Sequence, residues 1–444
     1  MHVALHRRLA VPTALAAAAA LALSACSSSG GSGSGSKDSG TKAQSGPVSL
    51  TFWSWAPNMD KVVALWNGSH PDIKVTVEKQ ASGDDLLTKT ITAAKAGGAP
   101  DLVQVEYQAL PTLVSNDVLA DIAGQQGGTK SQFADGVWQQ VTLGTDAVYA
   151  IPEDTGPLMF YYRKDLFKKY GLTVPTTWQQ FADTARTLHS KDPKKYLTTF
   201  SSNDAGLFAG LAQQAGAKWW TTSGDTWKVA LNDDATSKVA DFWGGLVQEK
   251  AIDNQPMYTP AWNKALNDGT QLAWVSAVWA PGVFTSAAPD TKGKWAMAPL
   301  PQWTAGESAT GSWGGSATGV TKNSKHADAA AKFAAWLNTD PTAVQALVQD
   351  AGIYPAATSA QTGGALAKAP DFFPDQADFY ATAAQIAGNT APAAWGPNVN
   401  VAYSAFKDAF GKAAQNRTPF GAALTAVQQA TLADMKKQGF KTTG

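Results

Sequence analysis

The chain contains a single cysteine, Cys26, and five histidines among 444 residues. One cysteine cannot form an internal disulfide bond, and the histidines beyond it lie too far apart in sequence for paired metal-ligand spacing. Nucleophile elbows, P-loops and dinucleotide-binding glycine patterns are also missing outside a low-complexity segment. We therefore expect no metal ion and no cofactor.

Arginine is scarce, because beyond residue 26 the chain has only Arg163, Arg186 and Arg417. Phosphate and carboxylate ligands usually call for more of these forked donors. Lysine plus arginine equals aspartate plus glutamate, at 35 each, and no basic cluster occurs. This composition argues against nucleic acid and acidic membrane surfaces as partners. Carboxylates are plentiful, so the paired acids of a glycoside hydrolase stay open as an alternative.

Long apolar runs are limited to one, at residues 9–23, which follows Arg7 and Arg8. About fifteen residues are too few to cross a bilayer comfortably but suit a secretory signal, which we place at 1–25. The Leu-Ser-Ala-Cys order ending at Cys26 resembles a bacterial lipobox, in which the cysteine becomes the lipidated first residue. The alternative is an ordinary signal peptide with a chance cysteine. With a Ser/Gly tether over 26–46, the sequence predicts a body anchored by lipid at the extracellular face of the cell membrane.

Beyond the tether, strands alternate with helices. We expect strands at 48–53, 73–77 and 102–105, and helices around 60–67 and 84–96. Ser82, with Asp85 three residues later, predicts a side-chain cap for the second of these helices. Such alternation favours parallel pairing in an α/β sheet.

Three later helices are expected at 176–188, 325–338 and 419–436. Thr176 and Gln179 predict a capping box at the start of the first. Trp178, Trp243 and Trp336 have the spacing of core residues on helices and are interpreted as packing. By contrast, the polar stretch that holds Trp219, Trp220 and Trp227 is predicted to lie at the surface.

Several short motifs occur in a familiar order along the mature chain. They are AGGAPDLV at 96–103, YAIPED at 149–154, FYYRKDLF at 160–167 with Gly171-Leu172 behind it, PTTW at 175–178, Gly314-Gly315, and IYP at 353–355. In order and spacing, this set resembles the extracellular solute-binding proteins that feed ABC importers. The maltose-binding-like branch, which takes up sugars and oligosaccharides, is the most similar.

The resemblance implies a two-lobed periplasmic-binding-protein-like α/β fold with ligand held in a cleft between the lobes. Mapped onto this chain, the first lobe would hold 47–153 plus 302–338 and the second 154–301 plus 339–444. Crossings are expected near 153–156, 298–302 and 338–341. The implied partners are a sugar or oligosaccharide and the permease of an ABC importer, with the binding protein itself a monomer that does no chemistry.

The 17 tryptophans outnumber the 10 tyrosines, and indole faces suit the C–H faces of a sugar ring, while carboxylates and amides suit its hydroxyls. The candidate ligand contacts are Trp53, Trp55, Glu106, Tyr107, Asp154, Asn203, Asp204, Trp279, Trp313, Gly314, Tyr354 and Trp395. Trp279, in a Trp-Ala-Pro turn after a predicted buried strand, ranks first. Either Trp53 or Trp55 could instead belong to the core, and Asn203 and Asp204 could simply cap a helix.

Two other functions remain open at this stage. An extracellular glycoside hydrolase with the same anchor would place two carboxylates across the cleft and would turn over an oligosaccharide. A binding protein for a peptide or another solute that is not a sugar would need clamps for charged termini, and the shortage of arginine argues against it.

Overall fold

The computed structural model describes residues 47–126 and 128–444. The predicted signal, Cys26 and the predicted tether lie outside the described residues. One sheet has strands in the order β2-β1-β3-β9-β4-β7, with β8 paired to β4. Its strands are β1 (Val48–Ser54), β2 (Ile73–Lys79), β3 (Leu102–Glu106), β4 (Ala150–Arg163), β7 (Ala273–Ala277), β8 (Trp295–Ala298) and β9 (Ser312–Val320).

The first strands confirm the predicted alternation. β1 pairs in parallel with both β2 and β3, and helices α1 (Met59–Ser69) and α2 (Asp84–Lys95) connect them in the chain. β3, by contrast, pairs antiparallel with β9, and β9 pairs antiparallel with β4. The α/β fold class predicted from the sequence is therefore confirmed, with a mixed rather than purely parallel sheet.

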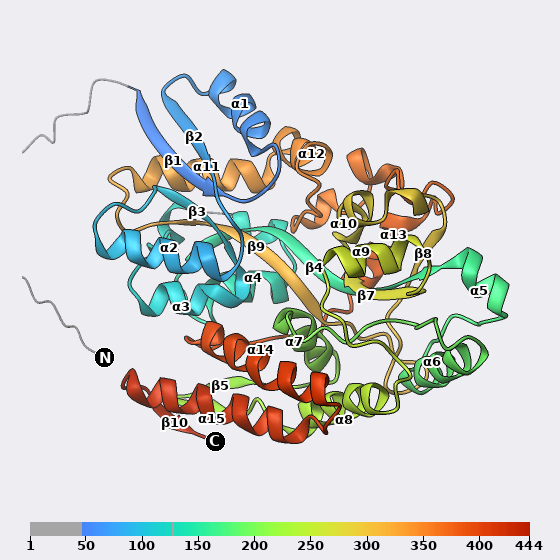
Figure 1. The fold of residues 1–444 in the computed structure, drawn as a ribbon. Coiled ribbons are helices and arrows are strands. Elements are labelled where there is room, and N and C mark those ends of the chain that lie inside the picture. Colours follow the sequence, from blue (N-terminus) through green and yellow to red (C-terminus); the bar gives the residue numbers. More distant parts are fainter. Residues whose placement is uncertain (1–46, 127) are drawn as a thin grey trace, which may run out of the picture. The chain divides into compact units, whose positions relative to one another are not determined.

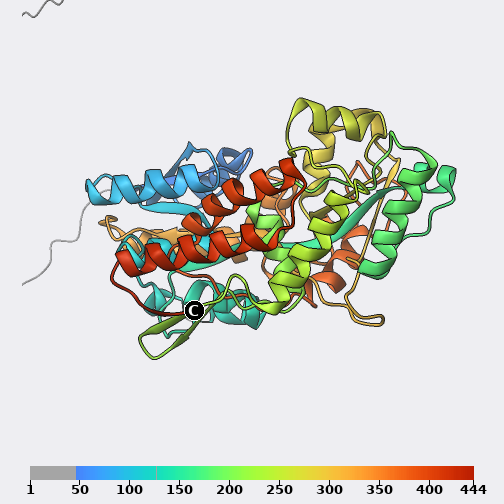
Figure 2. The same cartoon turned by 60° about the horizontal axis from the view of Figure 1, so that its bottom comes forward.

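The other helices cover the sheet and extend from it (Figures 1 and 2). They are α3 (Leu110–Ser115), α4 (Asp135–Thr142), α5 (Lys164–Tyr170), α6 (Trp178–Lys191), α7 (Ala205–Gln214), α8 (Asp234–Gln248), α9 (Pro260–Asn267), α10 (Ala280–Ala287), α11 (Ala327–Thr339), α12 (Pro341–Gln349), α13 (Phe379–Ala387), α14 (Val399–Asn416) and α15 (Gly421–Lys437). A small second sheet orders β10 (Lys441–Thr443), β6 (Thr226–Val229) and β5 (Trp220–Ser223). In the described part of the chain, no helix has the length and apolarity to traverse a membrane.

Two of the predicted helix caps are wrong in detail. The cap of α6 is Thr177, whose hydroxyl accepts from Gln180 N, while the Gln180 side chain accepts from Thr176 N at 2.9 Å. The box is therefore shifted by one residue, because the helix begins at Trp178. α2 begins after Gly83 without a side-chain cap, so Ser82 does not have the predicted role.

The buried apolar residues form two separate clusters. The cluster that we call the N-terminal core takes residues between Leu50 and Ile151 and between Ala317 and Ala357. The C-terminal core takes residues between Leu158 and Trp313 and again from Tyr354 to Met435. β4 and β9 run side by side from one core to the other (Figure 1).

The chain passes between the cores at places that partly differ from the expected crossings. The first passage lies on β4, between Ile151 and Leu158. The second lies on β9 after Trp313, later than 298–302, because β9 must pair with β4 beside both cores. The third follows α12, later than 338–341, since Leu347 of that helix still packs in the N-terminal core.

The tryptophans predicted to pack in the core do so, with Trp178 and Trp243 nearly inaccessible and Trp336 against Trp66 at 5.2 Å between ring centroids. The prediction of a surface position is wrong for Trp219 and Trp220, which are both buried. Their hairpin, β5–β6, is covered by α15, and Trp219 Nε1 donates to Thr236 Oγ1 at 2.8 Å. Packing from a distant helix is not visible in the local polar pattern.

Candidate functional site

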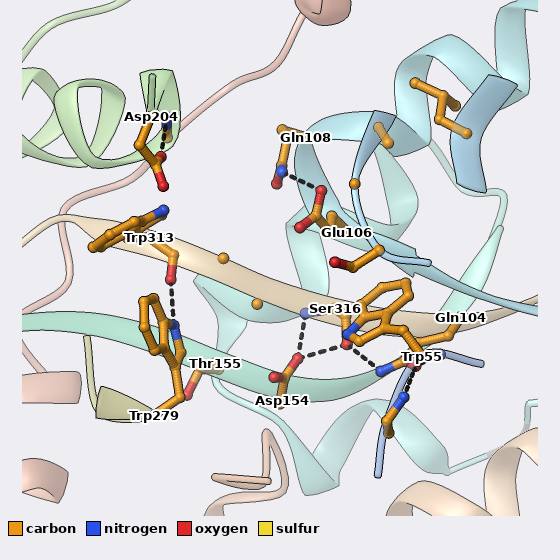
Figure 3. A pocket seen from close by; sticks show the side chains of 18 of the residues that line it. Trp55, Gln104, Glu106, Gln108, Asp154, Thr155, Asp204, Trp279, Trp313 and Ser316 are labelled. Carbon is orange, nitrogen blue, oxygen red and sulfur yellow. Dashed lines mark hydrogen bonds between the residues drawn. The ribbon is translucent and has the colours of Figure 1, made fainter. Parts of the chain in front are cut away.

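A cavity of about 470 Å³ has walls from both cores. On one side it is lined from the ends of β1 and β3, and on the other from α7, α14, Trp279 just before α10, and the loop before α9; β4 and β9 form its floor (Figure 3). Ligands of open α/β sheets commonly bind at the carboxyl ends of strands, as this cavity does for β1 and β3.

The wall from the N-terminal core, here called the N-wall, combines one indole, that of Trp55, with several polar side chains. Trp55 follows the last residue of β1, and its backbone N–H donates to Gln104 Oε1 at 3.1 Å. The Ser54 hydroxyl donates to the same oxygen at 2.7 Å. Glu106, at the end of β3, accepts from Gln108 Nε2 at 2.8 Å. The indole of Trp55 is half-buried, so its position is set through the backbone rather than by deep packing.

The opposite wall, here called the C-wall, is aromatic. The rings of Trp279 and Trp313 meet edge to face, with centroids 4.8 Å apart, and Trp279 Nε1 donates to the Trp313 carbonyl at 2.9 Å. Trp274 lies behind both, at 6.0 and 6.2 Å, and joins them to the C-terminal core. Tyr258 adds a further ring 6.4 Å from Trp313. The rings of this wall therefore support one another through direct contacts.

Close backbone packing positions Trp313. A side chain on Gly156 would collide with the Trp313 carbonyl, and one on Gly206 would come within 2.9 Å of the indole. Asp204 caps α7 beside it, because Asp204 Oδ1 accepts from Gly206 N at 3.0 Å and Leu207 N at 3.3 Å. Burial raises the pKa of Asp204 to about 6, although the positive charge of Lys407 opposes this rise. Glycine at these contacts is what allows helix and strand to approach so closely.

Tyr258 is 46% exposed and has a φ of 62°, which is unfavourable for a residue with a side chain. Asn203 Nδ2 donates to the carbonyl of the preceding Met257 at 3.2 Å, and Met257 N donates to Ser201 Oγ at 3.0 Å. Both backbone polar groups of Met257, the residue before Tyr258, are thereby hydrogen-bonded to side chains of the 201–203 segment. We infer that this fixation holds the strained backbone that presents the Tyr258 ring to the cavity.

The floor carries two adjacent carboxyl groups. Asp154 Oδ1 accepts from both the backbone N–H and the hydroxyl of Ser316, the latter at 2.6 Å. Burial raises the pKa of Asp154, and the Ser316 hydrogen bonds partly offset this rise. Glu153 points into the N-terminal core, away from the cavity lining, and burial raises its pKa to about 8.

Next to this floor, β9 carries Gly314 and Gly315 with φ of 79° and 95°. The β4–β9 pairing shifts register on both sides of Asp154 and Thr155. A side chain on Gly315 would come within 2.8 Å of the Tyr107 ring. Irregular pairing and permissive glycines thus coincide where the strands pass from one core to the other, as a hinge requires.

The structure brings most of the predicted contacts together at the cavity. Those that line it are Trp55, Glu106, Asp154, Asn203, Asp204, Trp279, Trp313, Gly314 and Tyr354. Whether they touch ligand stays a prediction. Tyr354 lies at the junction of the cores, where its carbonyl accepts from Thr155 N at 3.1 Å.

Three predicted contacts do not line the cavity. Trp53 packs under α2, with Lys89 Nζ 4.2 Å from its ring centroid and its own Nε1 donating to Glu78 at 2.8 Å. Trp53 and Trp55 do not lie on the same side of the strand as alternation would predict, because β1 ends at Ser54, between them. Tyr107 supports the floor from behind, donating to the Asp154 carbonyl at 3.0 Å. Trp395 lines a separate small hollow beside Trp219.

Several lining residues were missed by the sequence reasoning, notably Gln104, Gln108, Thr155, Tyr258, Ser316, Tyr403 and Lys407. Gln104 had a signal, since a glutamine inside an otherwise apolar strand must find hydrogen-bond partners. Tyr258 had none, because nothing in its local sequence reveals a positive φ.

Among the described residues, no arginine lines the cavity; its charged lining residues are Glu106, Asp154, Asp204 and Lys407. Over residues 47–126 and 128–444, no cluster of three or more His, Cys, Asp or Glu side chains could hold a metal ion. The arrangement thus offers flat apolar faces together with acceptors for hydroxyl hydrogens. Two cores, joined by paired strands and sharing one cavity, define a two-lobed ligand-binding protein.

The family model described as "Bacterial extracellular solute-binding protein" matches residues 53–344, and the chain belongs to this family. The resemblance inferred from the motifs is thereby confirmed. The galacto-N-biose/lacto-N-biose I-binding protein of the ABC transporter from Bifidobacterium longum, solved with lacto-N-biose, superposes with a TM-score of 0.81 at 30% identity. That match covers 90% of this chain and 100% of the other, and confirms the two-lobed fold.

Two curated relatives are also similar over most of the chain. The arabinooligosaccharide-binding protein of Bacillus subtilis (strain 168) is 26% identical over 317 residues, which is 68% of this chain and 70% of that protein. The lactose-binding protein of Rhizobium radiobacter is 27% identical over 361 residues, covering 76% and 81% respectively. These relatives are named for binding, not for catalysis.

Proposed function

We propose that this chain binds a sugar or oligosaccharide between its two lobes and delivers it to the permease of an ABC importer. The observation that carries the proposal is the pair of unlike walls: indoles on the C-wall facing Trp55, amides and a carboxylate on the N-wall. A sugar has apolar ring faces and a rim of hydroxyls, so it matches both. The sugars named for the three similar proteins support the same ligand class.

An estimate of the binding free energy from buried apolar area is consistent with micromolar binding of a sugar. Covering one indole face buries about 80–100 Å² of apolar surface, worth roughly 2–2.5 kcal/mol. Three such contacts with matched hydrogen bonds reach about 8 kcal/mol, which corresponds to micromolar affinity. Hydroxyls left without partners would cost a similar amount each, so the carboxylates and amides decide which sugar fits.

Closure of the lobes follows from the same geometry. A ligand shifts the open–closed equilibrium only if it contacts the two states differently. A sugar stacked on Trp279 would also contact Trp55, Glu106 and Gln108 once the N-wall closes over it. We infer that the C-wall captures the ligand and that the N-wall completes its enclosure.

A thermal-shift screen tests the function directly. Arabinooligosaccharides, lactose, lacto-N-biose and the maltose series should be compared with tripeptides, because a ligand of the folded state raises the melting temperature by mass action. We expect at least one sugar to raise it and the peptides to leave it unchanged. Release of reducing ends in the same mixtures would instead favour a hydrolase, and a shift caused only by peptides would contradict a sugar ligand.

We further propose that Cys26 is lipidated and anchors the protein to the extracellular face of the cell membrane as a monomer. The lipobox-like order before Cys26 and the Ser/Gly segment behind it support this anchor. Mass spectrometry of the mature N-terminus should find acylated Cys26 as the first residue. An unmodified N-terminus elsewhere in this segment would contradict the proposal.

A further inference from the structure

Glu153 is a carboxyl group buried under the cavity floor, only 1% exposed, at the first passage of β4 between the cores. Its Oε1 accepts from Gln104 Nε2 at 2.7 Å, and its Oε2 lies 2.6 Å from the hydroxyl of Thr318. Both partners are neutral. A buried carboxylate without a cation is costly, and such groups usually take up a proton instead.

Within residues 47–126 and 128–444, the groups that bond to Glu153 or act on its charge are neutral or acidic. β3 presents Gln104, β9 presents Ser316 and Thr318, and α11 presents Asn338, whose Nδ2 donates to Thr318 Oγ1 at 3.0 Å. The ionisable groups near it are Tyr107 of the short helix after β3 and the adjacent Asp154. Ionising Glu153 would therefore add a second negative charge beside Asp154 in a region of low dielectric.

Hydrogen bonding determines which oxygen can carry the proton. Gln104 Oε1 accepts from the backbone N–H groups of Trp55 and Ala56, at 3.1 and 3.3 Å, so its amide cannot be turned around. Gln104 Nε2 must then face Glu153, and Glu153 Oε1 must accept. Only Oε2 is left to hold a hydrogen. The Thr318 hydroxyl donates to Oε2 when Glu153 is ionised, and its oxygen accepts from Oε2 when Glu153 is protonated.

We propose that Glu153 holds a proton on Oε2 at neutral pH and acts as a positioning residue for the binding site. Glu153, through Oε1, keeps Gln104 in place, and Gln104 in turn holds the Trp55 backbone. Protonation of Glu153 also leaves the single negative charge of the carboxyl pair on Asp154, at the cavity, where two Ser316 donors stabilise it. The effect on ligand affinity rests on the proposed sugar-binding function; the proton itself does not.

The proton makes binding sensitive to alkaline pH. Burial raises the pKa of Glu153 to about 8, and the neighbouring Asp154 charge adds to the rise. Above this pH, ionised Glu153 places a second negative charge beside Asp154 under the cavity floor, and the cost of burying that charge favours water entry there. If only the protonated form binds, a midpoint near 8 lowers the apparent affinity about tenfold between pH 7 and pH 9.

The decisive variant is Glu153→Gln, because glutamine can accept from Gln104 and donate to Thr318 as the protonated acid does. We expect it to bind with affinity close to that of the wild type at pH 7 and to lose the tenfold decline at pH 9. Lactose serves as the first probe, replaced by the sugar with the largest shift in the screen if lactose does not bind. Glu249→Gln, on an exposed carboxylate paired with Arg186, is the matched control and should keep the wild-type decline.

Infrared difference spectroscopy of the wild type alone gives a readout that needs neither a variant nor a ligand. The carbonyl band of a buried protonated acid should be present at pH 7, disappear by pH 10, and be absent from Glu153→Gln. No such band at pH 7, or an alkaline decline unchanged in Glu153→Gln, would overturn the inference. A band with the expected titration in a protein that binds no sugar would sustain the proton and refute the proposed function instead.

Discussion

The two walls of the cavity differ in how they are held. The C-wall is continuous with the C-terminal core, since Trp279 and Trp313 rest on Trp274, which in turn packs on Trp262 at 5.1 Å. The N-wall has one lining indole, Trp55, fixed by backbone hydrogen bonds to Gln104. In the proposed binding mode, apolar affinity would come mainly from the C-wall, and polar selection from the N-wall, which one buried amide organises.

The strongest challenge to this division is Trp279→Ala. Losing an indole that stacks on the ligand should weaken sugar binding by about 2–3 kcal/mol, measured by isothermal titration calorimetry. The melting temperature should fall moderately too, because the bond from Trp279 Nε1 to the Trp313 carbonyl is lost. Trp227→Ala, on the hairpin away from the cavity, is the control and should bind normally. Normal binding by Trp279→Ala would remove the C-wall from the ligand site.

A pair of variants two residues apart sharpens the contrast between wall and core. Trp55→Ala should weaken binding by about 1–2 kcal/mol with little change in melting temperature, since the indole is half-buried and the Gln104 bond uses the backbone. Trp53→Ala should do the reverse, lowering the melting temperature while leaving affinity intact, because Trp53 packs under α2. Calorimetry measures the affinity of both variants, and thermal unfolding measures their stability. A loss of affinity in Trp53→Ala would show that Trp53 contacts the ligand after all.

The smallest effect is expected from the charge on the C-wall. Burial raises the pKa of Asp204 to about 6, so the folded state binds the proton more tightly than the unfolded chain. The stability gained from that proton is full below pH 4 and is lost as pH rises through 6. Asp204→Asn keeps the helix cap and should be more stable than wild type at pH 7 by about 1 kcal/mol, with a flatter pH profile.

Asp340→Asn is the matched control for that measurement. Asp340 caps α12 through the same kind of bonds, to Thr342 N and Ala343 N, but does not line the cavity. Denaturant unfolding from pH 4 to pH 8 should leave its profile parallel to that of the wild type. If the unfolding free energy of Asp204→Asn also varied with pH in parallel with that of the wild type, the raised pKa of Asp204 would be contradicted.

The sequence allowed the fold to be predicted because its evidence is local and repeated. Alternating strands and helices from residue 48 to 106, and motifs in fixed order, gave the α/β class and the family. The capping box at Thr176 was one residue early, since Thr176 and Thr177 are adjacent hydroxyls and only the helix start at Trp178 distinguishes them. The first passage between cores lies at the expected place, whereas the second and third lie later than expected, because β9 pairs with distant β4 and because α12 still packs in the N-terminal core.

The site was less predictable, for a similar reason. Trp55, Trp279 and Trp313 follow from aromatic residues at strand ends and beside glycines. Trp53 does not line the cavity although Trp55 does, because strand alternation holds only while a strand continues, and β1 ends between the two indoles. Tyr258 depends on a left-handed backbone fixed by Asn203, and the role of Glu153 depends on what surrounds it in three dimensions.

The way β4 and β9 thread both cores restricts how the molecule can be divided. Each core is assembled from segments that flank parts of the other, with 317–357 returning to the first after the chain has built much of the second. No single cut through the polypeptide separates them. A fragment that ended before β9 would lack the strand that pairs with both β3 and β4. Neither core can therefore be expressed or exchanged as one contiguous segment.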